Sequence, residues 1–427
     1  MDYAEALRAL DDRIPTRMVP DLDRVRAVSD LLDHPQRTYP SIHITGTNGK
    51  TTTAFVATAL VRAAGLSVGT YTSPHLHSIR ERIAYDGEPI SEAAFAETLT
   101  YLEPFLSQVD ALGERVTYFE TLTLLAETWF AERAADVAVM EVGMGGEWDA
   151  TNLVDGRVAV ITEVTRDHPE LGSTPVQIAG EKVGIIKPEA IVVTGERSPD
   201  VRAVIEERAR RTGASLREVG PDFAIEEREL AVGGQALDLR VGDRTYRQVF
   251  VPLYGERMAT DVLLGLAAVH AFLGDRPLED ELVREVLATV RSPGRMEVLR
   301  RRPLLIVDGA HNPAAARELA LTVRESFAHE GLLLVIGMLD DKDVAGVAEA
   351  LVPAADVVIA TTPRSPRAAP ADRLTKETAR LGAEPRTAAT VEGAVAQAIE
   401  LAGEKDAILV TGSFVTVGEA RALVLGM

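Results

Sequence analysis

Short runs of Val, Ile and Leu alternate along the chain with segments of helical periodicity. In most of these runs the apolar residues are nearly continuous and do not alternate with polar ones. Strands of this composition are typical of a parallel sheet that helices cover on both faces, so the pattern predicts an α/β fold. The expected strands lie at residues 42–45, 67–72, 136–142, 158–164, 190–196, 304–310, 332–338, 356–362 and 406–413.

One stretch has a different pattern. Residues 223–253 alternate apolar and polar side chains, and the pairs Gly233-Gly234 and Gly242-Asp243 supply turn signals. Alternation with a period of two, interrupted by short glycine turns, is typical of antiparallel strands. The sequence therefore predicts an antiparallel meander at about residues 222–253.

The length of the chain indicates more than one domain. At 427 residues it exceeds the size at which a single hydrophobic core usually stops growing. The second series of expected strands starts after Ser292, Pro293 and Gly294, which together are typical of a hinge. We therefore expect a larger domain over residues 1–292 and a smaller one over residues 293–427.

Composition and charge narrow the class of protein. With 46% apolar and 26% charged residues the chain has the composition of an ordinary globular protein, and no apolar run approaches the length of a membrane span. The first residues lack the basic-then-apolar pattern of a signal peptide, and the absence of cysteine excludes disulfides and thiolate chemistry. A net charge of −20 disfavours binding to a nucleic-acid backbone. We expect a cytoplasmic protein that binds neither membranes nor nucleic acids.

A glycine-rich segment follows the first expected strand. It has the sequence GTNGKTTT at residues 46–53 and leads into an alanine-rich helical stretch at 54–64. Glycines let backbone N–H groups approach phosphate oxygens, and the helix N-terminus adds positive potential. Lys50 would reach the β- and γ-phosphates, and Thr51 would place a hydroxyl on Mg²⁺. Because Ile44 stands where the strict Walker pattern has glycine, a chance Gly-Lys-Thr turn is the alternative. The residues expected to bind ATP here are Thr47, Asn48, Gly49, Lys50, Thr51 and Thr52.

Further segments occur in the order that is known from one enzyme family. They are SPHL at 73–76, ERI at 81–83, EVGMGG at 141–146, DATN at 149–152, DH at 167–168, EKVGIIKP at 181–188, PGRME at 293–297 and DGAHNP at 308–313. With the glycine-rich loop, this set resembles the folylpolyglutamate synthase/dihydrofolate synthase family of the Mur ligase superfamily over nearly the whole chain. The resemblance implies a Mur-ligase-type ATPase domain with a parallel sheet and a smaller Rossmann-like C-terminal α/β domain.

The resemblance also implies a metal site. Forming an amide from a carboxylate requires an activated acyl group, and hard oxygen ligands with Mg²⁺ serve the phosphoryl transfer from ATP. The implied ligands of a pair of Mg²⁺ ions, directly or through water, are Thr51, Ser73, Glu141 and His168. Lys182 resembles the lysine that the family carbamylates, a change that turns a cation into an anionic ligand. Considered singly, Glu141 could cap a strand end, His168 could be a loop histidine, and Lys182 a solvated helix lysine.

Other roles follow from the same resemblance. The implied catalytic residues are Lys50, Lys182, His168 and His311. Beyond the glycine-rich loop, ATP contacts are implied for Asp261, Arg295 and Asp308. The implied substrate contacts are Phe119, Glu120, Trp148, Asp149, Ala150, His311 and Asn312, of which the last two face the incoming amino acid.

At several positions the chain departs from the family pattern. Glu147 stands where the family has arginine before DATN, which predicts a negative charge at a pocket for an anionic acid. In the family segment LxGxHQxxNA, which touches adenine, histidine, glutamine and asparagine are replaced by Arg257, Met258 and Asp261. An ionised Asp261 can only accept hydrogen bonds, and Arg257, four residues earlier on the same helical face, could pair with it. Residues 165–170 read TRDHPE where the family has GxDHTxxLG.

Three functions are consistent with these observations. The leading hypothesis is an ATP-dependent ligase that joins L-glutamate to a pterin or folate carboxylate through an acyl phosphate. The departures leave open a paralogous amide ligase that joins an amino acid or another amine to a non-folate acid. A nucleotide-binding protein without catalysis is the third, and the retained Lys50, Glu141 and Lys182 argue against it. We expect small-molecule substrates and a monomer or weak dimer.

Overall fold

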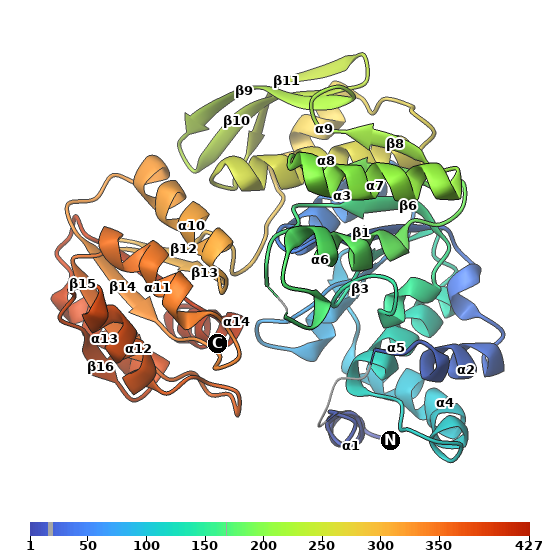
Figure 1. Cartoon of the computed structure of the whole chain (residues 1–427), viewed down its shortest axis with the longest axis horizontal. Helices are drawn as coiled ribbons and strands as arrows, with labels where there is room; N and C mark the ends of the chain where they lie inside the picture. The colour runs from blue at the N-terminus through green and yellow to red at the C-terminus, as the bar shows by residue number, and fades with distance from the viewer. Residues whose placement is uncertain (16–19, 168) are drawn as a thin grey trace. The chain divides into compact units, whose positions relative to one another are not determined.

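The computed structural model describes residues 1–15, 20–167 and 169–427 of the chain (Figure 1). It divides into two compact units. Unit 1 contains Met1–Pro252 and Ala259–Val290, and unit 2 contains Leu253–Met258 and Arg291–Met427. Each unit holds a largely parallel β-sheet with helices packed against it. The α/β class predicted from the apolar runs is confirmed.

The main sheet of unit 1 has eight strands in the order β4-β3-β2-β5-β1-β6-β7-β8. The six strands from β2 to β8 in this order are parallel to one another, and only β3 and β4 pair antiparallel, at one edge. Parallel strands bring their carboxyl ends to one edge of the sheet, where ligands bind in open α/β sheets. The bounds are β1 (Ser41–Thr45), β2 (Val68–Tyr71), β3 (Ile83–Tyr85), β4 (Glu88–Pro89), β5 (Val137–Glu141), β6 (Gly156–Ile161), β7 (Ile191–Thr194) and β8 (Ser215–Glu218).

Helices cover both faces of this sheet, which explains the continuous apolar runs. In β5 the side chains of Ala138 and Met140 join a core formed with α1, α2, α4 and α5. Alternate residues of the same strand point to the opposite face, where α3 packs on β1, β2 and β5. The helices are α1 (Tyr3–Asp11), α2 (Asp23–Leu31), α3 (Lys50–Ala63), α4 (Glu92–Asp110), α5 (Tyr118–Glu132), α6 (Pro175–Lys182), α7 (Pro199–Thr212), α8 (Glu256–Phe272) and α9 (Asp280–Leu287). Helix α8 begins in unit 2 and continues into unit 1.

The alternating stretch of the sequence forms a separate three-stranded sheet in unit 1. Its strands are β9 (Phe223–Ala231), β10 (Gly234–Val241) and β11 (Arg244–Val251), and β10 pairs antiparallel with both neighbours. Strand β11 packs against α9. Inward residues such as Leu237, Leu239 and Val249 are fully buried, whereas Val232 at the first turn is 96% exposed.

Unit 2 contains a six-stranded sheet in the order β12-β13-β17-β14-β15-β16, in which only β12 runs antiparallel to its neighbour. Its strands are β12 (Glu297–Arg301), β13 (Leu304–Asp308), β14 (Leu332–Ile336), β15 (Val357–Thr361), β16 (Arg386–Ala388) and β17 (Ala407–Thr411). Its helices are α10 (Pro313–Ser326), α11 (Val344–Leu351), α12 (Ala371–Arg380), α13 (Val391–Leu401) and α14 (Phe414–Leu425). One core cluster joins β13, β14, β15 and β17 to α10, α11 and α12.

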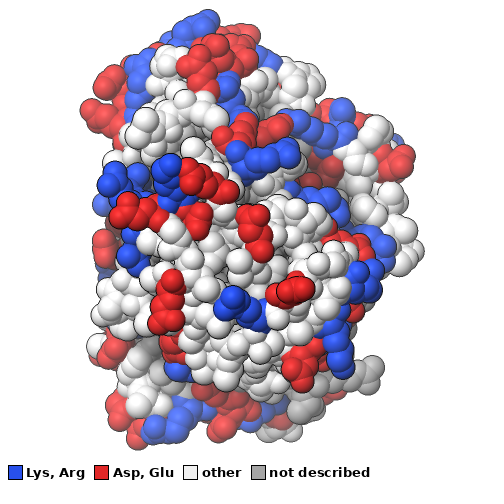
Figure 2. Space-filling model, turned by 90° about the vertical axis from the view of Figure 1, so that its left-hand side faces the viewer, with Lys and Arg blue, Asp and Glu red and all other residues white. Residues whose placement is uncertain are grey.

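The surface carries charges of both signs. On the face shown in Figure 2, acidic and basic side chains are interspersed, and neither sign forms a continuous surface there. Within the described parts of the chain, the helices are too short or too polar to span a bilayer.

A close contact between β2 and α5 yields a test of the core packing. Gly69 lies in β2, and a Cβ at this position would stand 2.5 Å from Cγ of the Phe130 ring. We expect Gly69→Ala to lower the free energy of unfolding by about 1–3 kcal/mol, because the ring must move within a filled core. Urea denaturation measures the change. The matched control is Gly113→Ala, where a Cβ meets no heavy atom within 4 Å; equal stability of the two variants would contradict the packing.

Candidate active site

The glycine-rich loop joins the end of β1 to the start of α3 and is fixed by residues that follow β6. Gly46 has a φ of +147°, and a Cβ there would lie 1.8 Å from Oγ1 of Thr162, so only glycine fits. The Thr162 hydroxyl donates to the Asn48 carbonyl at 2.6 Å. The Thr47 hydroxyl donates to the Thr165 carbonyl at 2.9 Å and accepts from the Thr165 amide at 2.9 Å. These contacts hold the loop in one backbone conformation.

Helix α3 begins directly after this loop. Gly49 has a φ of +89°, and a Cβ there would stand 2.1 Å from Oδ1 of Asp261 on α8. The Asp261 carboxylate, 2% exposed, therefore lies against the first turn of α3, where the helix dipole favours negative charge. Thr52, in the same turn, is buried. Loop residues and Asp261 are thus brought together, although 212 positions separate Gly49 from Asp261 in the sequence.

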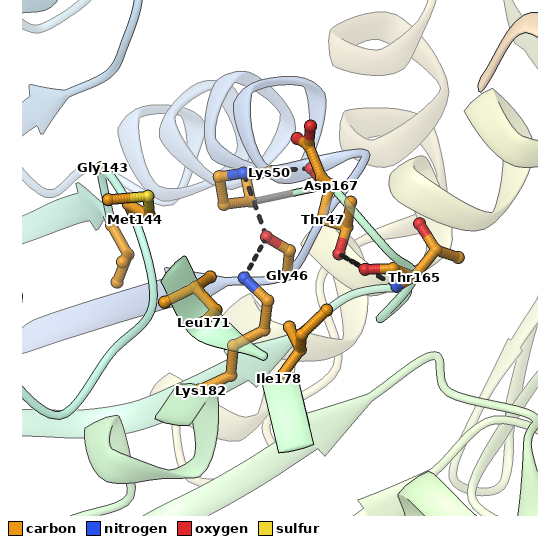
Figure 3. A pocket seen from close by; sticks show the side chains of 11 residues that line it. Gly46, Thr47, Lys50, Gly143, Met144, Thr165, Asp167, Leu171, Ile178 and Lys182 are labelled. Atoms are coloured by element: carbon orange, nitrogen blue, oxygen red, sulfur yellow. Dashed lines mark hydrogen bonds between the residues drawn. The ribbon is translucent and has the colours of Figure 1, made fainter. Parts of the chain in front are cut away.

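Two lysines from distant segments converge on one carbonyl oxygen of the loop (Figure 3). Nζ of Lys50 lies 3.1 Å from the Gly46 carbonyl and 3.2 Å from that of Thr47. Nζ of Lys182, at the end of α6, donates to the same Gly46 carbonyl at 2.7 Å. Both side chains line a pocket of about 290 Å³. Its other lining residues are Thr47, Val142, Gly143, Met144, Thr165, Asp167, Leu171 and Ile178.

The environment of Lys182 destabilises the protonated form of its amine. The side chain is buried, with the residue 4% exposed. Burial and, to a smaller extent, the nearby positive charge of Lys50 lower the pKa of the Lys182 amine to about 7. Negative charges on Asp167 and Asp149 act in the opposite direction but are weaker. A substantial fraction of the amine is therefore neutral at physiological pH, unlike that of a solvated helix lysine.

Glu141 gathers two of the predicted metal ligands at the carboxyl end of β5. Its carboxylate accepts from the Thr51 hydroxyl at 2.9 and 3.1 Å and from the Ser73 backbone amide at 3.1 Å. Hydroxyl and carboxylate oxygens are the hard ligands that Mg²⁺ prefers, and Mg²⁺ commonly retains waters in place of a full protein shell. Among the described residues no group of three His, Asp or Glu side chains forms an all-protein metal cage. The fourth predicted ligand, His168, lies outside the described residues.

Asp149 is held inside the protein by a buried hydrogen-bond chain. Its Oδ2 accepts from the Met144 amide at 2.9 Å, and its Oδ1 accepts from the Thr151 amide at 3.0 Å and the Thr151 hydroxyl at 2.6 Å. Because the hydroxyl proton points to Asp149, Nε2 of His43 must donate to Thr151, at 2.8 Å. Burial lowers the pKa of His43 to about 3, so the ring is neutral. Burial likewise raises the pKa of Asp149. This series of hydrogen bonds fixes the loop that carries Gly143 and Met144 of the pocket.

The other predicted acyl-substrate residues are distributed around this loop. The Phe119 ring packs against Gly143, where an added Cβ would lie 2.4 Å from its Cζ atom. The Trp148 ring packs beside Gly145. Ala150 is buried in the turn after Asp149. Glu120 is engaged elsewhere: it closes a capping box with Thr117 at the start of α5 and pairs with Nη2 of Arg24 at 2.9 Å. These are internal contacts, and Glu120 is 6% exposed.

In unit 2 the predicted residues gather at the carboxyl end of β13. Asp308 accepts from the Met296 amide at 2.9 Å and the Ala310 amide at 2.8 Å, which holds the PGRME and DGAHNP segments side by side. The Arg295 guanidinium lies 4.3 Å from the centroid of the Phe414 ring. Nδ1 of His311 contacts the Gly309 carbonyl at 2.8 Å, and Asn312 caps α10.

Two departures from the family pattern take on a different meaning in the structure. Glu147 was expected to place a negative charge at the substrate pocket, and its side chain is 59% exposed with its carboxylate 3.7 Å from Arg208 on α7. Glu147 is absent from the residues that line the pocket. Arg257, considered as a partner for Asp261, forms an ion pair with Glu318 of α10.

Two structural residues of the site had not been predicted from the sequence. His43 lies in the middle of β1, and Thr162 directly follows β6. A polar side chain inside an otherwise apolar strand was the available signal for His43. Nothing local distinguished Thr162, because its role depends on the loop that packs against it.

Two domains of the Mur ligase family match this chain. The Mur ligase middle domain matches residues 44–269, and the Mur ligase glutamate ligase domain matches residues 294–414. A dihydrofolate synthase/folylpolyglutamate synthase from Mycobacterium tuberculosis is 42% identical over 97% of this chain and 92% of its own length. The chain belongs to this branch of the Mur ligase family.

Solved structures of the family superpose over the whole chain. Folylpolyglutamate synthase of Mycobacterium tuberculosis complexed with ADP has a TM-score of 0.94, with 41% identity, and covers 99% of this chain and 98% of its own. A bifunctional folylpolyglutamate synthase/dihydrofolate synthase with Mn, AMPPNP and L-glutamate bound has a TM-score of 0.88, with 32% identity over 100% of this chain and 98% of its own. These family members bind an adenine nucleotide, and the second also holds a divalent metal and glutamate.

The lowered pKa of Lys182 predicts a pH-dependent stability. Between about pH 7 and 10 the unfolded state binds a proton at this amine that the folded state does not, so the contribution of Lys182 to stability rises with pH. Lys182→Met removes the titrating amine. The free energy of unfolding of this variant minus that of wild type should therefore fall as pH rises from 7 to 10, by up to about 1.4 kcal/mol per pH unit. Urea denaturation at pH 7 to 10, with CO₂ and bicarbonate removed so that Lys182 carries a free amine, measures this; a difference that does not vary with pH would rule out the shift.

Proposed function

We infer that this chain is an ATP-dependent ligase that joins L-glutamate to the carboxylate of dihydropteroate, of a folate, or of both. The observation that carries this is the convergence of Lys50, Lys182 and the Thr51–Glu141–Ser73 cluster around one glycine-rich loop. The family relationship supplies the substrates, because the relatives that match nearly the whole chain are folylpolyglutamate and dihydrofolate synthases. The chain is accordingly a carbon–nitrogen ligase.

The reaction we propose has two displacements. An oxygen of the substrate carboxylate attacks the γ-phosphorus of ATP, the bond to the bridging oxygen breaks, and ADP leaves. The amine of glutamate then attacks the acyl carbon, loses its proton and expels phosphate. Lys50 and the backbone amides of residues 47–52 bind the phosphates and offset the charge that spreads over the transferring group.

Thr51, Ser73 and Glu141, with His168, are proposed to hold Mg²⁺. Their hydroxyl and carboxylate oxygens fit this ion, and the carboxylate already contacts Thr51 and Ser73. Bound there, the metal would neutralise charge on the transferring phosphoryl group. A pair of ions, as the family resemblance implies, would share this small set of ligands with water.

We further propose that Lys182 is carbamylated. A neutral amine attacks the carbon of CO₂ and loses a proton, which leaves an N-carboxylate. The burial of Lys182 and its pKa of about 7 supply the neutral amine that this step requires. The product would carry a negative charge next to Lys50 and would remove the repulsion between the two ammonium groups.

The remaining site residues keep the roles that the family resemblance implies, as proposals. Asp261, Arg295 and Asp308 are assigned to the nucleotide. His311 and Asn312 are assigned to the amino acid, and because Nδ1 of His311 is turned to the Gly309 carbonyl, Nε2 is the ring nitrogen that would accept the amine proton. The proposed acyl-substrate contacts are Phe119, Glu120, Trp148, Asp149 and Ala150, of which Glu120 and Asp149 would keep their internal hydrogen bonds to Arg24 and Thr151.

Three wider assignments also remain proposals. The ATP-binding domain would extend over residues 1–292, with the three-stranded sheet inserted near its end, and the C-terminal domain over residues 293–427. The division of the chain into two compact units supports this. A cytoplasmic location and a monomer or weak dimer are proposed, the first supported by the absence of cysteine.

The folate ligase is favoured over the paralogous amide ligase. The strongest argument for a different acid was the negative charge of Glu147 at the pocket, and that carboxylate instead lies beside Arg208. Identity of 42% over 97% of the chain also favours the family activity.

Lys50→Ala tests the assignment of the glycine-rich loop. Loss of one phosphate-binding charge should lower turnover by about 10²-fold or more, because the interaction strengthens as charge develops in the transition state. The assay measures ADP release and the mass of the amide product with dihydropteroate or a folate, plus glutamate and ATP-Mg²⁺. Lys405→Ala is the control, since this exposed lysine pairs with Glu330 on the surface of unit 2. Wild type inactive with every folate substrate but active with another acid would establish the paralogue.

Lys182→Ala tests the carbamate. The variant should be nearly inactive, and acetate or formate should restore part of the turnover by placing a carboxylate in the vacated position. Sodium chloride at the same ionic strength is the control and should restore nothing. Wild type that remains fully active after thorough removal of CO₂ and bicarbonate, with a free lysine amine in its mass spectrum, would exclude the modification.

A further inference from the structure

The segment that leaves β2 returns to the site through a short 3-10 turn, Ile79–Arg82. The Thr72 amide donates to the Arg82 carbonyl at 2.9 Å, and the next residue, Ser73, donates its amide to Glu141. The backbone of Arg82 is therefore anchored one residue away from the proposed metal cluster. None of the roles assigned above uses the Arg82 side chain.

The Arg82 guanidinium has neutral neighbours. Its Nε donates to Nδ1 of His75 at 2.9 Å, and its Cζ lies 5.7 Å from the centroid of the Tyr118 ring. A ring nitrogen that accepts a hydrogen bond carries no proton, so His75 is in its neutral form with the proton on Nε2. Within the described residues Arg82 forms no ion pair with a carboxylate. Arg82 is thus a half-buried arginine that, in the described parts of a chain of net charge −20, has no carboxylate within ion-pair distance.

The neighbouring charges of this turn are already engaged. Glu81 directs its carboxylate to backbone amides, accepting from Leu76 at 2.9 Å, His77 at 3.0 Å and Ser78 at 2.8 Å. Arg80 lies 4.0 Å from Glu92. Arg80 therefore has an acidic neighbour, whereas Arg82 has no carboxylate partner in the part of the chain that the structure describes. The hydrogen bond to His75 leaves the four N–H groups of the two Nη atoms of Arg82 as donors.

Aromatic rings lead from Arg82 to the pocket. Tyr118 beneath the guanidinium is followed in α5 by Phe119, whose ring lies against Gly143 of the pocket lining. The centroid of the Tyr71 ring lies 5.9 Å from that of Phe119. Arg82 thus lies near Tyr118 of α5, and the next residue of that helix contacts the pocket that Lys50 and Lys182 line.

We propose that Arg82 binds the α-carboxylate of a glutamyl group already present on the acyl substrate, and so selects folates for further glutamylation. The inference rests on the proposed function. A guanidinium held at Nε presents its remaining donors as a fork that matches a carboxylate. Dihydropteroate has a single carboxylate, the reacting one, whereas a folate that ends in glutamate has a second carboxylate next to the γ-carboxylate that reacts. Arg82 therefore acts on one of the two substrates.

Arg82→Gln separates the two substrates. We expect KM for a folate monoglutamate to rise about tenfold or more, because a charge-assisted hydrogen bond is lost. KM for dihydropteroate and for glutamate should stay within about twofold of wild type, as should kcat with dihydropteroate. Arg82→Lys should recover only part of the loss, since an ammonium lacks the fork. Arg80→Gln is the matched control in the same turn and should leave every KM unchanged.

The outcomes are distinct. An equal rise in KM for folate and dihydropteroate, a rise for glutamate alone, or no change in any KM would overturn the role of Arg82 while leaving the ligase assignment intact. Wild type that ligates neither substrate would overturn both. Binding of the folate monoglutamate and of pteroate can also be measured without turnover, by the quenching of tryptophan fluorescence. In Arg82→Gln the affinity should fall for the folate and stay unchanged for pteroate.

Discussion

The Gly46 carbonyl is the point on which the site depends. Two lysine amines, one from the start of α3 and one from the end of α6, share this single acceptor. Placing them together costs electrostatic energy, and the protein limits that cost by burying Lys182 until its pKa falls to about 7. The arrangement requires a backbone that cannot shift. Gly46 packs on Thr162 with no room for a Cβ, and the Thr162 hydroxyl fixes the loop by donating to the Asn48 carbonyl.

Around this point, the parallel sheet delivers the remaining groups. Glu141 ends β5, and the segments that follow β1 and β2 bring Thr51 and Ser73 to the same edge, so a single carboxylate contacts both. A second, neutral network lies beside it, in which His43 holds Thr151 and Thr151 holds Asp149. The first network contains the residues proposed to bind phosphate and metal, whereas the second holds the pocket loop in place.

Motif positions predicted which residues matter better than where their side chains point. Thr51, Ser73 and Glu141 come together as expected. Glu147 shows the limit, because its place within a motif suggested a pocket-facing charge, but a loop directs successive side chains to different sides and Arg208 was available on α7. A sequence comparison places a residue along the chain, and only packing gives its direction.

The sequence alone determined the α/β class, the meander, the glycine-rich loop between a strand and a helix, and the family. Each of these depends on local patterns: apolar runs, period-two alternation, and glycines next to a lysine and a threonine. Tertiary structure decided the lowered pKa of Lys182, the pairing of Glu120 with Arg24, the internal hydrogen bonds of Asp149 and the contact of the half-buried Arg82 with His75. These depend on burial and on partners from other segments, often about a hundred positions away. Burial and charge interactions act through space, so spacing along the chain could not reveal them.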